Sequence, residues 1–342
     1  MPITIRDIAR KLNLSIAAVS RALDGYPDIS PETRRRVEEA AREMGYVPNR
    51  AARQLRRKRS DTLGFILPVS APRFAEPFYS EFIEGLGDET AAQGFDLLIT
   101  TAAPETDAEQ NAYRSWVLGN KVDGVVINRV RLLDWRVQFL AANQVPFSGL
   151  ELSQDGVKYP HVTTHNREAF QDLVRHLARA GFSRPAYIGG PLESIIQYER
   201  QSGFVAGVLQ AGLELRPEWL AVTDLTSEGG YQAALEMLSL SERPDALVCI
   251  NDETAFGALR AVEDHHLSIG RDVAVTGFDG VREARYTNPP LTTQDVPVYD
   301  IARTLVRLLC AAVRSEPVVA EQVIFAPRLL ERPSSAGGGA KA

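Results

Sequence analysis

Apolar residues recur at helical spacing in three short stretches near the start of the chain, and each stretch follows a residue that often caps a helix. Thr4 precedes the first stretch, Ser15 the second and Ser30 the third. Asn13 and Gly45, which tolerate the left-handed backbone conformation, end the first and third stretches. The pattern predicts a bundle of three helices over about residues 3–46, with these apolar residues facing inward: Ile5, Ile8, Ala9, Leu12, Ala18, Val19, Leu23, Val37, Ala40, Ala41 and Met44.

Beyond Thr62 the pattern changes to short apolar runs that alternate with amphipathic stretches of helical length. This alternation is typical of parallel sheets with helices on both faces. It is too long for one compact open sheet, so we expect two similar lobes with a cleft between them, joined by the segment Glu151–Pro160. The expected strands are 63–67, 95–100, 124–128, 184–188, 221–223, 246–250 and 273–276, and the expected helices are 78–93, 105–118, 132–143, 166–180, 195–211, 228–240, 252–266 and 298–314.

The predicted fold is therefore a small all-α headpiece followed by a two-lobed α/β core in which parallel sheets are flanked by helices. We place the headpiece at residues 1–47, a basic linker at 48–60 and the core at 61–332. The tail at 333–342 contains Ser334-Ser335-Ala336-Gly337-Gly338-Gly339. A segment of this composition is low in complexity and is expected to be disordered.

Positive charge is concentrated at one end of the chain. The chain carries a net charge of −6, yet residues 1–60 hold 14 Lys and Arg against 7 Asp and Glu. A basic head on an acidic body is expected when one end binds a polyanion. Residues 48–60 carry six positive charges and no acid, which is also compatible with a solvated linker, but the lone apolar Leu55 argues for a short helix that forms beside phosphates.

The first two predicted helices are joined by a three-residue turn, and the second carries small side chains and one exposed arginine, Arg21. A thin helix of this kind fits the major groove of DNA, so the pattern predicts a helix-turn-helix that reads a DNA sequence.

Several other classes of protein are disfavoured by what the sequence lacks. The start of the chain shows no signal peptide and no apolar run is long enough to span a membrane, so we expect a cytoplasmic protein. No phosphate loop, dinucleotide fingerprint or nucleophile elbow is present, and the five histidines have no metal-ligand spacing. We therefore expect no enzyme activity, no cofactor and no metal. Cys249 and Cys310 lie in apolar runs and are expected to be buried free thiols.

The chain resembles the lactose-repressor (LacI) family of bacterial transcription regulators. The resemblance covers about residues 2–332, and its segments in the headpiece are Thr4–Ala9, Ser15–Leu23, Ile29–Arg34 and Gly45–Asn49. In the core they are Glu76–Tyr79, Val122–Val126, Arg200 with Gly203–Phe204, Asn251–Asp252, Gly277–Asp279 and Pro290–Thr293. The resemblance implies a helix-turn-helix headpiece, a hinge helix and a core like that of periplasmic sugar-binding proteins. It also implies a homodimer that binds a pseudo-palindromic operator and is controlled by a small molecule, often a sugar, bound between the lobes.

At the positions where this family reads base edges, the chain has Ile16, Ala17 and Arg21. The first two side chains offer only apolar contact, for which the thymine methyl group is the natural target. Arg21 is able to bind guanine through two hydrogen bonds, although a plain phosphate contact is the alternative.

Other headpiece residues are expected to hold the DNA backbone or its shape. Ser15, Ser20 and Asn49 suit phosphate better than bases. Leu55 matches the family's hinge leucine, two copies of which wedge into the minor groove at the operator centre. We expect Leu55→Ala to leave the fold and ligand binding intact but to weaken operator binding.

In the cleft, Arg200, Asn251 and Asp279 match the positions that hold ligand hydroxyls in sugar-binding family members. Phe78 and Tyr79 are candidates to cover a sugar face. By position, the cleft residues also include Tyr198 and Glu151. The alternatives are a turn-forming role for Asp279 and ordinary core packing for Phe78 and Tyr79.

The chain departs from the family pattern at His165, Val69 and Leu225, where an Asp, an Asp or Ser, and a stacking Trp are common. These departures argue against a familiar monosaccharide site. The additional residues Ala71–Ala75 near the cleft mouth suggest space for a disaccharide or a larger glycoside.

The strongest reading is a repressor of carbohydrate-utilisation genes that is released from its operator by a sugar or oligosaccharide. A corepressor-dependent repressor or an activator that responds to a non-sugar metabolite is the alternative, since the direction of control depends on which lobe arrangement the ligand prefers. A stand-alone sugar-binding transport protein is disfavoured by the basic headpiece. A dimer is expected because the tail has no heptad repeat.

Overall fold

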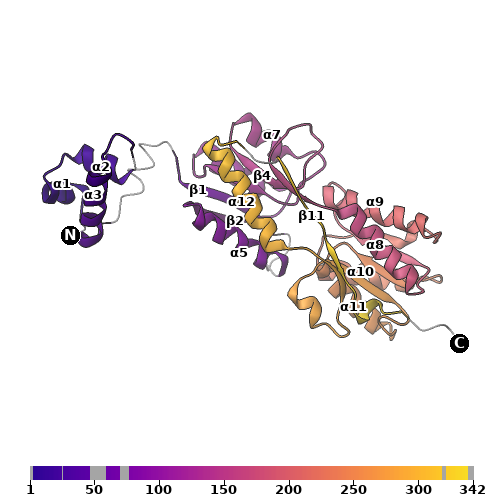
Figure 1. Ribbon diagram of the computed structural model, residues 1–342. Coiled ribbons are helices and arrows are strands. Elements are labelled where there is room, and N and C mark those ends of the chain that lie inside the picture. Colours follow the sequence, from indigo (N-terminus) through magenta and orange to yellow (C-terminus); the bar gives the residue numbers. More distant parts are fainter. Residues whose placement is uncertain (1–2, 25, 47–58, 70–76, 318–320, 338–342) are drawn as a thin grey trace. The chain divides into compact units, whose positions relative to one another are not determined.

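In the computed structural model the chain forms two compact units, residues 1–59 and residues 60–342 (Figure 1). The structure describes residues 3–24, 26–46, 59–69, 77–317 and 321–337. Ser60 belongs to the second unit rather than to the predicted linker, because its backbone N–H and its hydroxyl both donate to the carboxylate of Asp123, at 2.6 and 2.9 Å.

The headpiece is the predicted bundle of three helices, α1 (Ile5–Leu12), α2 (Ile16–Leu23) and α3 (Pro31–Met44). Each helix begins where the sequence provides a cap. The Ser15 hydroxyl accepts a hydrogen bond from the N–H of Ala18 at 3.0 Å, and the backbone N–H of Thr4 donates to the Asp7 carboxylate at 2.9 Å. The apolar stripes meet in a small core centred on Ile8, Val19 and Val37, which are fully buried.

The described residues of the core unit form two six-stranded sheets. The first has the order β11-β5-β4-β3-β1-β2 and its strands pair in parallel. The second has the order β12-β10-β9-β8-β6-β7, with β12 as an antiparallel edge strand. The strands are β1 (Thr62–Pro68), β2 (Asp96–Ala102), β3 (Gly124–Ile127), β4 (Phe147–Leu150), β5 (His161–Thr164), β6 (Pro185–Gly189), β7 (Leu220–Val222), β8 (Ala246–Cys249), β9 (Ala274–Asp279), β10 (Thr292–Asp295), β11 (Gln322–Phe325) and β12 (Arg328–Leu330).

The part of this unit that the structure describes has eight long helices, and all of them coincide with predicted helices to within three residues at each end. They are α5 (Pro77–Ala92), α6 (Asp107–Leu118), α7 (Trp135–Ala142), α8 (Asn166–Arg179), α9 (Ile195–Gln210), α10 (Ser227–Leu238), α11 (Asp252–Asp264) and α12 (Val298–Arg314). Three short 3-10 turns accompany them, at Pro217–Trp219, Arg282–Arg285 and Pro333–Ser335.

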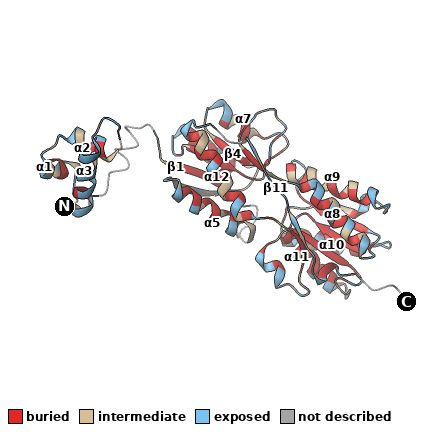
Figure 2. Cartoon of the chain, in the orientation of Figure 1, coloured by how far each residue is buried: buried red, intermediate tan, exposed pale blue. Residues whose placement is uncertain are grey.

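Helices cover the sheets, and the strands within are almost entirely buried (Figure 2). Alternate strand residues pack against opposite helix layers. In the first sheet, Phe65 packs in the cluster that includes α5 and α12, whereas its neighbour Ile66 packs in the cluster that includes α6 and α7. In the second sheet, Val248 faces α8 and α9, whereas Leu247 faces α10 and α11. This is the expected burial pattern of a doubly covered parallel sheet.

The prediction that Glu151–Pro160 crosses between the lobes is wrong. β4 and β5, which flank this segment, are neighbours in the first sheet. The chain crosses instead at three later places: between β5 and α8, between β10 and α12, and between β11 and β12. The strand β5 was not predicted because His161–Thr164 is half polar.

The second error concerns the tail from residue 333. Pro333–Ser335 forms a 3-10 turn in which Ser334 and Ser335 are fully buried. The Ser334 hydroxyl donates to the carbonyl oxygen of Val275 at 2.6 Å and accepts from the N–H of Thr292 at 2.8 Å. The serines are therefore partners for strand ends of the second lobe, which composition alone did not indicate.

Candidate DNA-binding and effector sites

The start of α2 presents the side chains that were predicted to face DNA. Ser15, Ile16 and Ala17 are all exposed, and Ile16 keeps 47% of its surface open to solvent. Ile16 is absent from the apolar core of the bundle. Single exposed apolar residues are common on protein surfaces, so its exposure leaves the side chain accessible to DNA but is not by itself a sign of a partner. The oxygen of Ser15 already accepts the capping hydrogen bond, which leaves its hydroxyl proton for another acceptor.

Arg21 is exposed at the last turn of α2 and is held from the following loop. Its guanidinium forms an ion pair with Asp28 and lies 5.4 Å from the centre of the Tyr26 ring. Ser20 differs from its neighbours, since it is only 5% exposed and its hydroxyl lies 3.5 Å from the Asp24 carboxylate. It therefore lies behind the exposed surface of α2. The other two predicted DNA contacts, Asn49 and Leu55, are outside the described residues.

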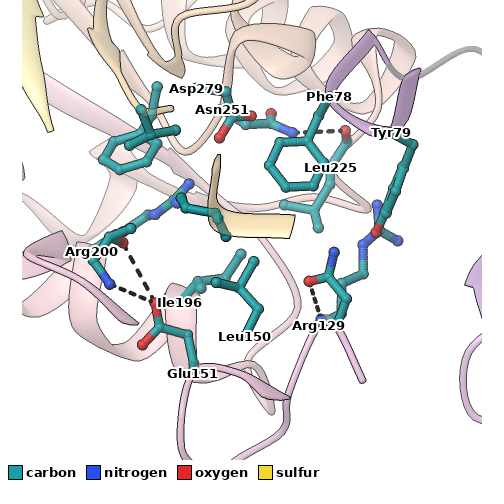
Figure 3. Close-up of a pocket in the computed structure, with 15 residues that line it drawn as sticks. Phe78, Tyr79, Arg129, Leu150, Glu151, Ile196, Arg200, Leu225, Asn251 and Asp279 are labelled. Atoms are coloured by element: carbon teal, nitrogen blue, oxygen red, sulfur yellow. Dashed lines mark hydrogen bonds between the residues drawn. The ribbon is translucent and has the colours of Figure 1, made fainter. Parts of the chain in front are cut away.

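A cavity of about 630 Å³, a volume that includes its open mouth, lies between the two lobes of the core unit (Figure 3). Six of the seven predicted effector residues line it, and they come from both lobes. The lining consists of Phe78, Tyr79, Asn128, Arg129, Leu150, Glu151, Thr164, Ile196, Arg200, Leu225, Asn251, Phe278, Asp279, Val296 and Ile301. A cavity with mainly apolar walls and a few convergent polar groups is the usual form of a small-molecule site.

One side of the cavity is built on a buried chain of hydrogen bonds. Glu151, only 4% exposed, accepts from the hydroxyl of Thr163 and from Nδ2 of Asn166, the latter at 2.9 Å. The Nε of Arg200 donates to Oδ1 of Asn166 at 2.8 Å, and its Nη1 donates to the carbonyl oxygen of Ile250 at 2.6 Å. Asn166 thereby links a carboxylate of the first lobe to a guanidinium of the second.

Burial opposes the charged forms of both groups in this chain. It raises the pKa of Glu151 above its usual value, although the hydrogen bond from Thr163 acts in the opposite direction. Burial also lowers the pKa of Arg200, against the attraction of the nearby Asp279 carboxylate. Desolvated polar groups of this kind discriminate strongly among ligands, because any group that a ligand leaves unpaired costs free energy.

On the second lobe, Asn251 and Asp279 stand at the ends of neighbouring strands. Asn251 caps α11, since its Oδ1 accepts from the N–H of Thr254 at 2.9 Å. Asp279 ends β9 with a φ of 115°. The fully buried Asp252 fixes the next loop, because its Oδ2 accepts from the N–H of Val281 at 2.9 Å. Asp279 is thus both the residue at a backbone turn and part of the cavity lining.

Phe78 and Tyr79 also have two roles. Their rings meet edge to face with centroids 5.2 Å apart, and Phe78 stacks on Phe82 at 5.6 Å. Tyr79 is 1% exposed, so it contributes to the core as well as to the cavity. Tyr198 is the one predicted effector residue that does not line the cavity. It is 45% exposed on α9, two positions before Arg200 and therefore on another side of the helix.

The sequence reasoning missed Asn128 and Arg129, which follow the buried strand β3 directly. Polar residues at the carboxyl end of a parallel strand are a recognised sign of a ligand site, so this signal was available. Nδ2 of Asn128 is buried and has no hydrogen-bond partner among the described residues. Leu150, Ile196, Val296 and Ile301 were also missed, because apolar lining residues look like core residues in a sequence.

All three departures from the family pattern lie in the described part of the core, and Val69 packs against the apolar cluster that contains Phe65. The additional residues Ala71–Ala75 are outside the described residues. Leu225 lines the cavity and has a φ of 70°. His165 is the residue before α8, and its half-exposed ring lies 3.6 Å from the Glu168 carboxylate. It does not line the cavity, whereas the next residue, Asn166, is the buried link described above.

Comparison with known proteins gives the family of the chain. The profile of the "Bacterial regulatory proteins, lacI family" matches residues 4–49, and that of the "Periplasmic binding protein-like domain" matches residues 174–335. The HTH-type transcriptional regulator AglR of Rhizobium meliloti (strain 1021) is 32% identical over 339 residues, which cover 98% of this chain and 95% of AglR. The chain belongs to the lacI family of bacterial regulatory proteins.

Solved structures of similar proteins agree with this assignment. A complex of the transcriptional regulator CelR with cellobiose is 28% identical, with a TM-score of 0.74 over 97% of this chain and 99% of CelR. A lac repressor dimer bound to operator and the anti-inducer ONPF is 25% identical, with a TM-score of 0.82 over 98% of this chain and 99% of that chain.

Membership of this family defines the general function. The chain is a DNA-binding transcriptional regulator with a helix-turn-helix headpiece and a ligand-responsive core, and its family is one of regulators rather than of enzymes. In the described residues, no helix combines the length and the apolar character that crossing a membrane would need.

Proposed function

We propose that the protein is a homodimeric repressor of carbohydrate-utilisation genes that a sugar or oligosaccharide releases from a pseudo-palindromic operator. The observation that carries this proposal is the cavity between the lobes, which six predicted effector residues line. A ligand that contacts both lobes favours one arrangement of them, and this preference is what a regulatory ligand requires.

The chemistry of the cavity suits a carbohydrate. Phe78, Leu225 and Phe278 supply apolar surface for the C–H faces of a sugar ring. Arg200 donates hydrogen bonds, whereas a carboxylate at Asp279 accepts them from hydroxyl groups. The structure of CelR, which is similar over almost the whole chain, is that of a complex with cellobiose, and this supports a sugar of one or more rings.

For the headpiece, we propose that Ile16 and Ala17 contact thymine methyl groups and that Arg21 reads a guanine in each half-site. Ser15, Asn49 and, less directly, Ser20 would hold phosphates, and Leu55 would wedge into the minor groove at the operator centre. The operator-bound dimer of the lac repressor supports this arrangement and the homodimer. Since its target is chromosomal DNA, we place the protein in the cytoplasm.

The test is a fluorescence-anisotropy titration of the full chain against a palindromic DNA site from the upstream region of its own gene. The titration is repeated at several salt concentrations and with cellobiose, maltose, and a set of monosaccharides and other oligosaccharides. We expect tight binding that weakens steeply with salt, because phosphate contacts release counterions. One sugar should abolish the binding.

Other outcomes would change the proposal in defined ways. Binding that occurs only after a ligand is added would make the protein corepressor-dependent. Release by nucleosides or phosphosugars, with no response to neutral sugars, would replace the sugar effector. Absence of sequence-specific binding under all conditions would contradict the proposed role of the headpiece.

A further inference from the structure

The loop between β3 and α7 faces the cavity on one side and the second lobe on the other. Asn128 and Arg129 line the cavity. Immediately after them, the N–H of Leu132 donates to the carbonyl oxygen of Glu193 at 2.7 Å, and the N–H of Ile195 donates to that of Val130 at 3.1 Å. Two main-chain hydrogen bonds therefore join the lobes next to the ligand cavity.

The contact extends into the interior on both sides. Arg131 and Ser194 form an isolated antiparallel bridge. Ile195 is 6% exposed and packs in the hydrophobic cluster of the first lobe, although it is the first residue of the second-lobe helix α9. The same helix carries Ile196 and Arg200 into the cavity. A movement of the β3–α7 loop would therefore change both the wall of the cavity and the contacts at the start of α9.

Beneath this loop lies a cluster of four charged side chains, Glu109, Arg131, Asp134 and Arg136, which are 1–6% exposed. Arg136 donates two hydrogen bonds to the carboxylate of Asp134, at 2.9 Å through Nε and 2.6 Å through Nη2. Arg131 donates through Nη2 to Glu109 at 2.9 Å. Such a cluster is costly to bury unless its hydrogen bonds are well formed, so it is weak evidence for stability. Nη1 of Arg131 is buried without a hydrogen-bond partner among the described residues, whereas Arg136 is fully engaged.

The cluster holds the main chain of the loop directly. Nη1 of Arg136 donates to the carbonyl oxygen of Asn128 at 3.1 Å, and Nη2 donates to that of Arg129 at 2.9 Å. Asp134 accepts from the backbone N–H of Arg131 at 3.0 Å. Arg129 has a φ of 49°, in the left-handed region that a residue with a side chain rarely adopts without support. Arg136 itself does not line the cavity.

We propose that Arg136 is a positioning residue of the effector site. By fixing the carbonyl groups of Asn128 and Arg129, it sets one wall of the cavity and holds Val130–Leu132 against Glu193–Ile195 of the second lobe. Its role at the cavity rests on the proposed effector site, whereas its role at the lobe contact does not require a ligand and can be tested alone.

The test is hydrogen–deuterium exchange of the full chain, read by mass spectrometry with residue-level fragmentation, in Arg136→Gln and the wild type. We expect the amides of Leu132 and Ile195 to exchange at least about tenfold faster in the variant, because local opening limits their exchange. The amides of Val125 and Val126 in β3 should keep their wild-type rates. Arg260→Gln, which changes a surface ion pair on α11, is the matched control and should alter none of these amides.

Two results would overturn the proposal. One is unchanged exchange at Leu132 and Ile195, and the other is an equal acceleration throughout the first lobe, which would indicate a loss of stability only. If Arg136→Gln fails to fold, Arg136→Lys replaces it. The lysine ammonium keeps a positive charge beside Asp134, but it cannot reproduce the planar set of hydrogen bonds that the guanidinium makes. Faster exchange at the two amides is still expected in that variant, and wild-type rates would refute the proposal. A wild-type protein that responds to no sugar would contradict the proposed function and not this inference, because the exchange rates are read without a ligand.

Discussion

The guanidinium carbon of Arg200 lies 3.7 Å from the centre of the Phe278 ring, inside the cavity between the lobes. The guanidinium group therefore lies over an aromatic ring, while its Nε donates to Asn166 and its Nη1 to the carbonyl oxygen of Ile250. An arginine held by these three contacts would lose little further side-chain entropy when its remaining N–H groups bind a ligand.

We expect Arg200→Lys to weaken the effector response by about 10- to 100-fold, since hydrogen bonds to a charged group contribute about 1.5–3 kcal/mol. A lysine cannot stack and also serve both partners of Arg200. The measurement is the sugar concentration that half-releases the operator in the anisotropy assay. The affinity of Arg200→Lys for the operator without sugar should be unchanged. The control is Arg167→Lys, which alters a surface ion pair with Glu199 and should change neither the operator affinity nor the half-releasing sugar concentration. An unaltered sugar response in Arg200→Lys would remove Arg200 from the effector site.

The second prediction concerns Asp252, whose pKa burial raises well above its usual value, with a further contribution from the Asp279 charge. The folded state therefore binds this proton more tightly than the unfolded state does. The resulting stability is fully present below about pH 4 and is lost as the pH rises through the folded-state pKa. We expect the free energy of unfolding of the wild type, relative to Asp252→Asn, to fall steadily from pH 4 upward in urea titrations.

Asp264→Asn is the matched control for that experiment. Hydrogen bonds from Tyr231 and Arg260 lower the pKa of this exposed carboxylate. The wild type should consequently lose stability relative to this variant only as the pH falls, the opposite direction. A pH-independent difference between wild type and Asp252→Asn would mean that Asp252 has the same pKa in both states.

The third prediction tests the close packing of α10 on α11. A Cβ added to Gly257 would overlap the carbonyl oxygen of Ser227, so the two helix backbones would have to move apart. We expect Gly257→Ala to lower the free energy of unfolding by about 2 kcal/mol or more. Gly87→Ala on α5 provides the contrast, because no described atom beyond its own stretch of helix lies within 4 Å of the added Cβ. That variant should be as stable as the wild type or more stable by about 0.5–1 kcal/mol.

The fourth prediction concerns the headpiece. Arg21→Ala should lose discrimination at one base pair of each half-site, by about 1–3 kcal/mol, while non-specific DNA binding weakens much less. The measurement is the affinity for operators carrying each base at that position, compared with Arg35→Ala on α3. Equal weakening on every DNA sequence would instead identify Arg21 as a phosphate contact.

The helices of the core were predictable because each has one apolar face, whereas several strands were not. β10 reads Thr292-Thr293-Gln294-Asp295, yet its first three residues are at most 1% exposed. Their polar atoms are paired at long range, for example Thr293 with Asp252 and Gln294 with the carbonyl oxygen of Ala169. A pattern of hydrophobicity cannot reveal partners that lie 41 and 125 residues away.

The residues that line the candidate effector site also differ in how far the sequence could predict them. Arg200, Asn251 and Asp279 were found because the family resemblance supplied their positions, and Asn128 could have been found from its place after a buried strand. Ile196 and Ile301 gave no signal, since nothing in their neighbourhood distinguishes a cavity wall from a core. Tyr198 was included by position alone, and the helical rotation between it and Arg200 turns it outward.

The three crossings between the lobes also constrain how this protein is made. The first lobe receives α12 and β11 only after the second lobe has been translated through β10, and the second lobe receives β12 and the Pro333–Ser335 turn later still. While the ribosome is still adding residues before Val298, the first-lobe residues Phe65 and Leu86 lack the α12 side of their cluster. The final packing of both lobes therefore waits for the last strands, and until then apolar surface of the first lobe that α12 will cover is exposed to association with other chains.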